Sequence, residues 1–223
     1  MSRGLLRRLF AEGLGTAALL AVVVGSGIMG ETLSKGNDAV ALLANSLATG
    51  CGLAVLILTL GPISGAHFNP VVSLVSALDR GVRWAEAGAY VLVQFAAAAL
   101  GAIVAHLMFG LPVITASLKV RTGPAQWLAE VVATFGLVAV IRGCARQPIT
   151  VVCLAVGSYI TSAYWFTAST SFANPAVTFA RSLTDTFAGI RPMDAPAFML
   201  AQLVGGVAGL YVAKVLWPKA EVS

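Results

Sequence analysis

The chain has 223 residues, of which 58% are hydrophobic and 10% are charged, and its mean hydropathy is +0.89. Soluble domains average roughly 45–50% apolar and about 25% charged residues, so this composition excludes a water-soluble domain and places most of the chain in lipid. The formal charge of +5 does not predict nucleic-acid binding, because the basic residues are scattered at the ends of apolar segments instead of lining one face.

Six apolar segments are long enough to cross a bilayer, which requires about 20 predominantly apolar residues per helix. We interpret the first as a retained span, because no small-residue cleavage site followed by a polar mature domain appears after it. The predicted spans cover residues 9–30, 39–60, 84–109, 125–143, 149–168 and 195–216.

The distribution of Lys and Arg predicts how these spans are oriented. An even number of spans places both termini on one side, and that side then carries nine of the fourteen basic residues. Because Lys and Arg accumulate in cytoplasmic loops, we predict that both termini are cytoplasmic.

Two further apolar segments, residues 69–78 and 174–183, are too short to span a membrane, and each begins with Asn-Pro. Segments of this length are typical of re-entrant or interfacial helices. One follows the second predicted span and the other follows the fifth. Each half of the chain therefore has the order helix, helix, half-helix, helix.

The two halves also begin alike, with Glu12-Gly-Leu-Gly-Thr16 in the first span and Glu130-Val-Val-Ala-Thr134 in the fourth. Because each half contains an odd number of spans, the second half must run inverted in the membrane, which places a functional site near the midplane. We predict an all-α membrane protein with six transmembrane helices, two re-entrant half-helices and an inverted 3+3 repeat. It forms a single transmembrane domain over residues 1–223, with repeats of about 1–110 and 111–223.

The Asn-Pro pairs are chemically suited to start the half-helices. An Asn side-chain oxygen caps the exposed amides of a first helical turn, and Pro fits the next position because its missing N–H would be unpaired there. Each helix start carries about half a positive charge. We therefore expect Asn69 and Asn174 to face each other with their NH₂ groups free to donate to a passing neutral solute, and the paired helix starts to repel cations.

With these features the chain resembles the aquaporin and aquaglyceroporin family, the major intrinsic proteins. The resemblance rests on the six spans, the two half-helices and the motifs "SGAHFNPVVS" and "ANPAVTFAR", and it covers essentially the whole chain. It implies that Asn69 and Asn174 are central pore donors, and that Glu12 and Glu130 brace the re-entrant loops by accepting backbone N–H groups. Capping or snorkelling near a span end is the alternative for the two glutamates. The resemblance also implies a homotetramer with one pore per subunit.

Two positions depart from the family pattern. The pore motifs are Asn69-Pro70-Val71 and Asn174-Pro175-Ala176. The first departure is Val71, where the family usually has alanine. The second is Val177, at the position three residues after the second Asn, where most relatives have an arginine in the outer constriction.

The remaining residues of this selectivity filter are placed by their spacing from the two asparagines. They are Thr49, Ser162 and Ser171, which join Val177. Thr161 and Ala163 are the alternatives to Ser162 if the following loop differs in length. Because none of the four predicted residues is aromatic or charged, we expect a filter wider than that of a water-only pore.

Such a filter predicts a passive channel for uncharged solutes of at least glycerol or urea size, and for water. Aquaporin-type channels that lack the arginine resemble those encoded with bacterial arsenic-resistance genes. This resemblance makes arsenous acid a candidate solute and a bacterial inner (plasma) membrane the expected location. An ion-coupled secondary transporter is the alternative, because such transporters also use broken helices and inverted repeats.

The roles of two basic residues near the motifs stay open. His67 precedes Asn69 by two residues and is either a packed or backbone-bonded histidine or, as the resemblance implies, lies beside the cytoplasmic pore mouth. Arg181 follows Val177 by four residues, one helical turn further outward, and either lines the vestibule or sits among polar loop groups.

No sequence cluster predicts catalysis. The three cysteines, Cys51, Cys144 and Cys153, lack metal-type spacing and are an odd number, and no Ser-Lys or Cys-His pair occurs at helical spacing. We expect no enzymatic activity, no metal and no other cofactor. The expected partners are small neutral solutes, water and the lipid bilayer, and no nucleic acid.

Overall fold

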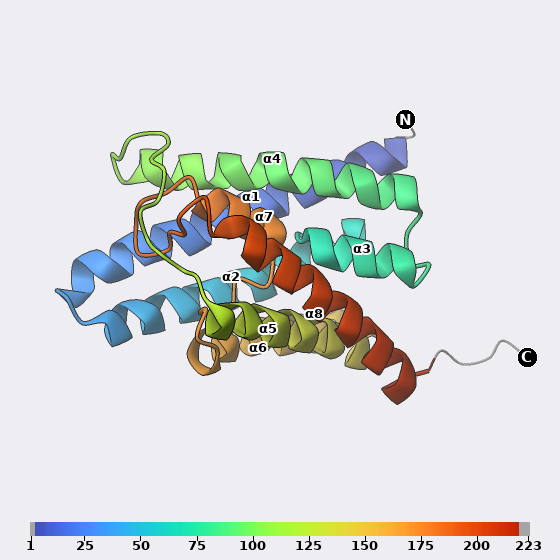
Figure 1. Ribbon diagram of the computed structural model, residues 1–223. Coiled ribbons are helices and arrows are strands. Elements are labelled where there is room, and N and C mark those ends of the chain that lie inside the picture. The colour runs from blue at the N-terminus through green and yellow to red at the C-terminus, as the bar shows by residue number, and fades with distance from the viewer. Residues whose placement is uncertain (1–2, 219–223) are drawn as a thin grey trace, which may run out of the picture.

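A computed structural model describes residues 3–218 as a bundle of helices (Figure 1). Among these described residues, six helices are long and apolar enough to cross a membrane, which confirms the six predicted spans. They are α1 (Arg3–Ser34), α2 (Asp38–Ser64), α4 (Trp84–Met108), α5 (Pro124–Gly143), α6 (Ile149–Phe166) and α8 (Ala195–Leu216). Helices α1 and α2 extend beyond the predicted 9–30 and 39–60, because hydropathy marks the apolar part of a helix and not its hydrogen-bonded ends.

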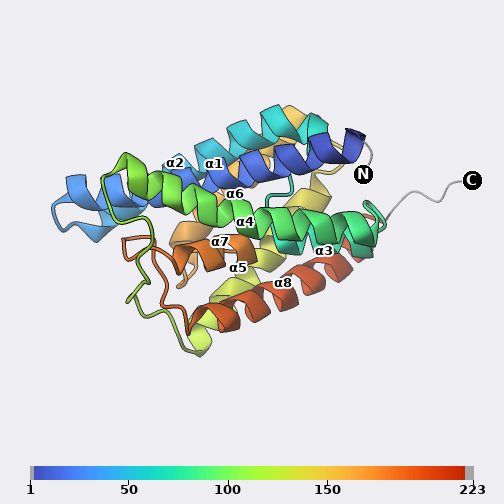
Figure 2. The ribbon, with the colours of Figure 1, turned by 90° about the horizontal axis from the view of Figure 1, so that it is seen from above.

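The two short helices lie inside the bundle, between the long ones. They are α3 (Pro70–Leu78) and α7 (Pro175–Arg181). Figures 1 and 2 both show them roughly end to end along the bundle. Each begins with the predicted cap, since the side-chain oxygen of Asn69 accepts from Val71 N and that of Asn174 accepts from Ala176 N and Val177 N. The two re-entrant half-helices therefore form as the Asn-Pro pairs predict.

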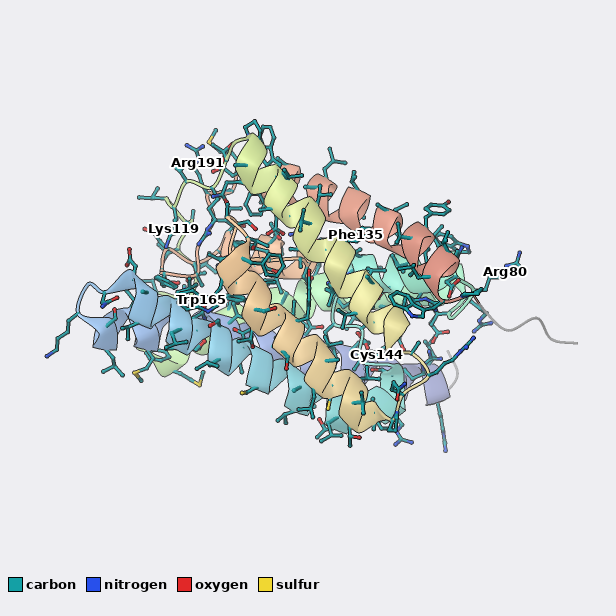
Figure 3. All side chains as sticks on the ribbon, turned by 90° about the horizontal axis from the view of Figure 1, so that it is seen from below. Arg80, Lys119, Phe135, Cys144, Trp165 and Arg191 are labelled. Atoms are coloured by element: carbon teal, nitrogen blue, oxygen red, sulfur yellow. The ribbon has the colours of Figure 1, made fainter. Side chains whose placement is uncertain are left out.

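The bundle has two distinct ends. Helix α1 begins and α8 ends at the same end, which we call the terminal end (Figures 1 and 2). Arg80 lies at this end, whereas Lys119 and Arg191 lie at the opposite, distal end (Figure 3). This arrangement agrees with an even number of spans.

Small residues let the long helices approach closely. A Cβ atom added to Gly157 of α6 would lie 2.6 Å from the carbonyl oxygen of Gly50 of α2, and one added to Gly50 would lie 2.7 Å from the oxygen of Gly157. The two backbones are therefore in contact at this crossing, which joins the first half of the chain to the second. Such contacts drive helix association where lipid gives no hydrophobic advantage to burial.

The distal end is covered by the long connection between α4 and α5, residues 109–123. This segment pairs with the loop after α7: Ser117 N donates to Ser182 O at 3.1 Å, and Arg191 N donates to Lys119 O at 2.7 Å. The connection is thereby held over the end of the bundle to which α7 points.

Candidate functional site

A cavity of about 240 Å³ lies between the half-helices and the long helices. Toward the terminal end it reaches Asp79 and Arg142, whose side chains form an ion pair at 2.6 Å. Toward the distal end it reaches Thr49 and Val177. The cavity thus runs past the starts of both half-helices.

Asn69 and Asn174 line this cavity and are tied to each other's loops. The Asn69 amide nitrogen donates to the carbonyl oxygen of Ala173, and the Asn174 amide nitrogen donates to that of Phe68, both at 2.7 Å. The expectation that both NH₂ groups are wholly free is therefore wrong. Since an amide nitrogen carries two hydrogens, one N–H of each asparagine is not used by these two bonds.

The loops before the two asparagines share an unusual backbone. Ala66 and Phe68 have φ angles of +50° and +48°, and Ser171 and Ala173 have +49° and +48°. Non-glycine residues in this left-handed region cost of order 1–3 kcal/mol each and persist where surrounding contacts hold them. The same alternation occurs in both halves, so both loops need an external brace.

Glu12 lies against the first of these loops and is fully buried. One carboxylate oxygen accepts from His67 N at 2.9 Å and the other from Phe68 N at 2.7 Å. Ser64 Oγ and Gln94 Nε2 also donate to this carboxylate, at 2.7 and 2.9 Å. The carboxylate is thus satisfied by four donors, which suits a charge at membrane depth better than snorkelling would.

Glu130 lies in the same way against the second loop. Its oxygens accept from Phe172 N and Ala173 N, both at 2.9 Å, and from Gln202 Nε2 at 2.6 Å. Gln202 also donates to Thr178 Oγ1 at 2.8 Å, just as Gln94 donates to Ser73 Oγ at 3.0 Å in the first half. Neither glutamine was predicted as a site residue, although a lone amide inside an apolar span is a signal for such a partner.

Val71, the first departure from the family pattern, points away from the cavity. It is fully buried in a cluster with Val75, Val138 and Leu210. A side chain at Gly206 would collide with Val71, so this glycine makes the room that the larger residue needs. The substitution therefore alters packing behind α3 and not the cavity wall.

Three of the four predicted filter residues line the distal part of the cavity, namely Thr49, Ser171 and Val177. Each of them is nearly inaccessible to solvent. The hydroxyl of Ser171 is buried and has no hydrogen-bond partner within residues 3–218. The cavity wall here combines hydroxyl groups with the methyl groups of a valine.

The placement of Ser162 in the filter is wrong. Ser162 is exposed on the outside of α6, where its hydroxyl bonds to the carbonyl oxygen of Tyr159 at 2.8 Å. The cavity face of α6 recurs every four residues through Val156, Ile160 and Tyr164. Ser162 lies two residues from this series, about 200° around the helix.

Tyr164 is therefore the α6 residue at the distal part of the cavity. Its side chain lines the wall, and its hydroxyl lies 3.3 Å from Thr49 Oγ1. This part of the cavity wall thus contains an aromatic residue, which none of the four residues predicted for it is.

Comparison with known proteins places the chain in a family. The sequence profile described as "Major intrinsic protein" matches residues 1–149. The chain belongs to this family. The aquaglyceroporin AqpS of Rhizobium meliloti (strain 1021) is 58% identical over 206 residues, which are 92% of this chain and 88% of that protein. Aquaporin NIP1-4 of Oryza sativa subsp. japonica is 32% identical over 219 residues, covering 95% of this chain and 77% of that protein.

The fold agrees with this membership. The X-ray structure of the aquaglyceroporin from Plasmodium falciparum matches with a TM-score of 0.74, covering 96% of this chain and 98% of that one at 21% identity. As a major intrinsic protein, the chain is a membrane channel and not an enzyme.

Tyr164 gives a direct test of where the filter of this major intrinsic protein lies. We expect Tyr164→Ala to raise glycerol flux relative to water flux by roughly fivefold, equivalent to about 1 kcal/mol of barrier, because it removes a ring from one wall. Stopped-flow light scattering on proteoliposomes measures both fluxes. Ser162→Ala is the matched control on the same helix and should leave the ratio unchanged. Equal ratios for the two variants would contradict the assignment of Tyr164.

The two basic residues left open by the sequence take different positions. His67 lines the cavity, with Nδ1 3.0 Å from Ser73 Oγ and its ring edge-on to Tyr90. It is therefore packed against α3 and α4 and also faces the cavity. Arg181 is fully buried at the end of α7, where its Nε donates to the carbonyl oxygen of Ala188. It sits among loop groups behind the cavity wall.

Proposed function

We propose that this chain is a passive channel that lets water and uncharged solutes of glycerol or urea size cross a membrane down their gradients. The proposal depends on one observation, the meeting of two Asn-capped helix starts on a single cavity. A neutral solute accepts a hydrogen bond from the remaining N–H of Asn69 or Asn174. A cation meets two positively polarised helix ends instead.

The distal part of the cavity supports solutes larger than water. Val177 stands where most family members have an arginine, so the wall there lacks up to five donors, a full charge and considerable bulk. Ser171 offers a buried hydroxyl without a partner in residues 3–218, and Thr49 offers a second hydroxyl. We propose that these three residues and Tyr164 form the selectivity filter. The hydroxyl groups of a solute form hydrogen bonds with the polar side of the filter, and its carbon atoms contact the methyl groups on the other side.

Arsenous acid is our proposed solute beyond glycerol and urea. It is neutral at pH 7 and carries three hydroxyl groups on a molecule close to glycerol in size. It therefore forms hydrogen bonds with the same groups of the cavity wall as glycerol does, and it fits through the same cross-section of the cavity. The relative from Rhizobium meliloti is named an aquaglyceroporin, which supports a filter wide enough for glycerol.

The cellular arrangement is also a proposal. We infer a bacterial inner membrane with the terminal end in the cytoplasm, because that end carries most of the Lys and Arg. We further propose a homotetramer, loop bracing by Glu12 and Glu130 as in the resemblance, and two inverted repeats over about 1–110 and 111–223. The matching Glu–Gln contacts in the two halves support the repeats.

Reconstituted protein tests the proposed function. Proteoliposomes should show glycerol, urea and arsenous acid fluxes that rise linearly with the gradient and do not depend on a sodium or proton gradient. Empty liposomes and the cap variant Asn174→Leu, checked for folding by size exclusion in detergent, are the controls. Saturable flux that requires an ion gradient would support the secondary transporter and contradict the channel.

A further inference from the structure

The wall that lacks an arginine at Val177 has two other arginines directly behind it. Phe172 lines the cavity, and its ring is in contact with the guanidinium of Arg181, whose Cζ lies 3.4 Å from the ring centroid. The guanidinium of Arg121 is also over this ring, at 5.1 Å. The ring packs with Ile190 and Phe198, which do not line the cavity, so the loop segment that carries Phe172 separates two cationic groups from the solute path.

These two arginines are held in place by carbonyl groups and not by carboxylates. Arg121 donates from Nε to Gly189 O at 2.9 Å and from Nη1 to Ser169 O at 3.1 Å. Arg181 donates from Nε to Ala188 O, while its Nη1 is buried with no partner in the described residues. Neither guanidinium forms an ion pair within residues 3–218. Their charges are solvated by neutral dipoles and are not cancelled locally.

The two carboxylates next to these arginines do not neutralise them. Glu130 is within electrostatic range of both guanidinium groups, but it is one carboxylate against two cations. Asp194 accepts from Arg121 N at 3.0 Å, but its carboxylate is already paired with Arg191 at 2.9 Å.

The titration of the loop residues agrees with a positive region. Burial lowers the pKa of Arg121 to about 10, so this group stays charged at pH 7. Burial, followed by the charges of Arg121 and Arg181, lowers the pKa of Lys119 in the same loop. Lys119 and Arg191 mark this distal end of the bundle in Figure 3.

We propose that Arg121 and Arg181 are specificity-determining residues that restore, from behind Phe172, the cation barrier that the filter lacks at Val177. A charge in the wall of a narrow, low-dielectric passage acts on a solute without touching it. Because the two arginines lie behind the lining, they leave the cross-section of the cavity free for larger neutral solutes, while their electric field still acts on the solute path. In this arrangement the lining residues select solutes by size and the arginines behind them repel cations, whereas an arginine in the lining would do both. This inference rests on the proposed channel function.

The test uses urea and guanidinium, which have the same planar shape and differ in charge. The flux ratio of guanidinium to urea in proteoliposomes, with membrane potential clamped by valinomycin and potassium, reports charge selection separately from size. We expect Arg181→Met, which keeps an unbranched side chain over the ring, to raise this ratio by roughly tenfold or more. Arg121→Gln should also raise the flux ratio of guanidinium to urea. It serves as the test if Arg181→Met does not fold.

Two matched variants separate charge from structure. Arg181→Lys keeps the charge and should keep the low ratio. Lys35→Gln removes an exposed cation in the turn after α1, at the same end of the bundle, and should also leave the ratio low. A raised ratio in Arg181→Met should fall again when Val177→Arg is added.

An unchanged ratio with normal urea flux in both Arg181→Met and Arg121→Gln would overturn the inference and leave the channel standing. A wild-type chain that passes no urea would overturn the proposed function and this inference with it.

Discussion

Replacing Val177 with arginine is expected to reduce glycerol flux by at least about tenfold, which corresponds to an added barrier of roughly 1.4 kcal/mol. Val177 is buried in the cavity wall, so a longer side chain at this position has to extend into the solute path. Its guanidinium would also occupy hydroxyl acceptors that a polyol uses. Water flux should fall much less, because water is smaller and exchanges hydrogen bonds with a guanidinium readily.

The measurement is a comparison of glycerol, urea and water flux in the same proteoliposome preparation. Val177→Leu is the matched control, since it adds a methylene group without charge or donors, and should change the three fluxes by less than the arginine does. Cell-surface or liposome protein levels normalise each flux. If Val177→Arg left solute selection unchanged, Val177 would not belong to the filter.

Local sequence was sufficient to predict the two half-helices. Asn-Pro fixes a cap and a first helical residue within two positions, and the short apolar runs after it set the lengths of α3 and α7. The six spans follow equally directly from composition and length. These features depend on neighbours in sequence, which is why no knowledge of the tertiary structure was needed.

The α6 residue at the distal part of the cavity was not predictable in this way. Counting back from Asn174 assumes a known path for residues 167–173, and that path contains left-handed residues at Thr170, Ser171 and Ala173. A small change in such a loop rotates the preceding helix relative to the cavity. The α6 residue that lines the cavity there is therefore Tyr164, two positions along the chain from the predicted Ser162.

Long-range contacts of the distal loop were also beyond the sequence. Arg121 reaches Gly189 and Ser169, which are 68 and 48 positions away along the chain. Nothing in its local surroundings indicates these partners, because they lie in segments far away along the chain. Gln94 and Gln202 are a different case, since two solitary amides in apolar spans were visible and only their partners were not.

The largest loss of stability is expected from Glu130→Leu. This change leaves the backbone amides of Phe172 and Ala173 and the amide of Gln202 without their acceptor in a buried site. Each unsatisfied buried donor costs about 1–3 kcal/mol, so the free energy of unfolding should fall by at least about 3 kcal/mol. The left-handed residues of the loop would also lose the contact that holds them, and Asn174 would lose its position.

Unfolding by sodium dodecyl sulfate in mixed micelles, followed by circular dichroism, measures this loss. Glu130→Gln is the intermediate case, because it keeps one carbonyl oxygen as an acceptor but adds donors that face other donors, and it should lie between wild type and Glu130→Leu. Glu31→Gln is the matched surface control: Glu31 is exposed and accepts from Phe187 N at 3.1 Å, and its loss should cost less than about 0.5 kcal/mol.

If Glu130→Leu unfolded at the wild-type detergent fraction, the loop would be held by its own backbone and Glu130 would not brace it. A folded Glu130→Gln with reduced urea flux would instead show that the brace sets the position of Asn174 as well as the stability of the bundle.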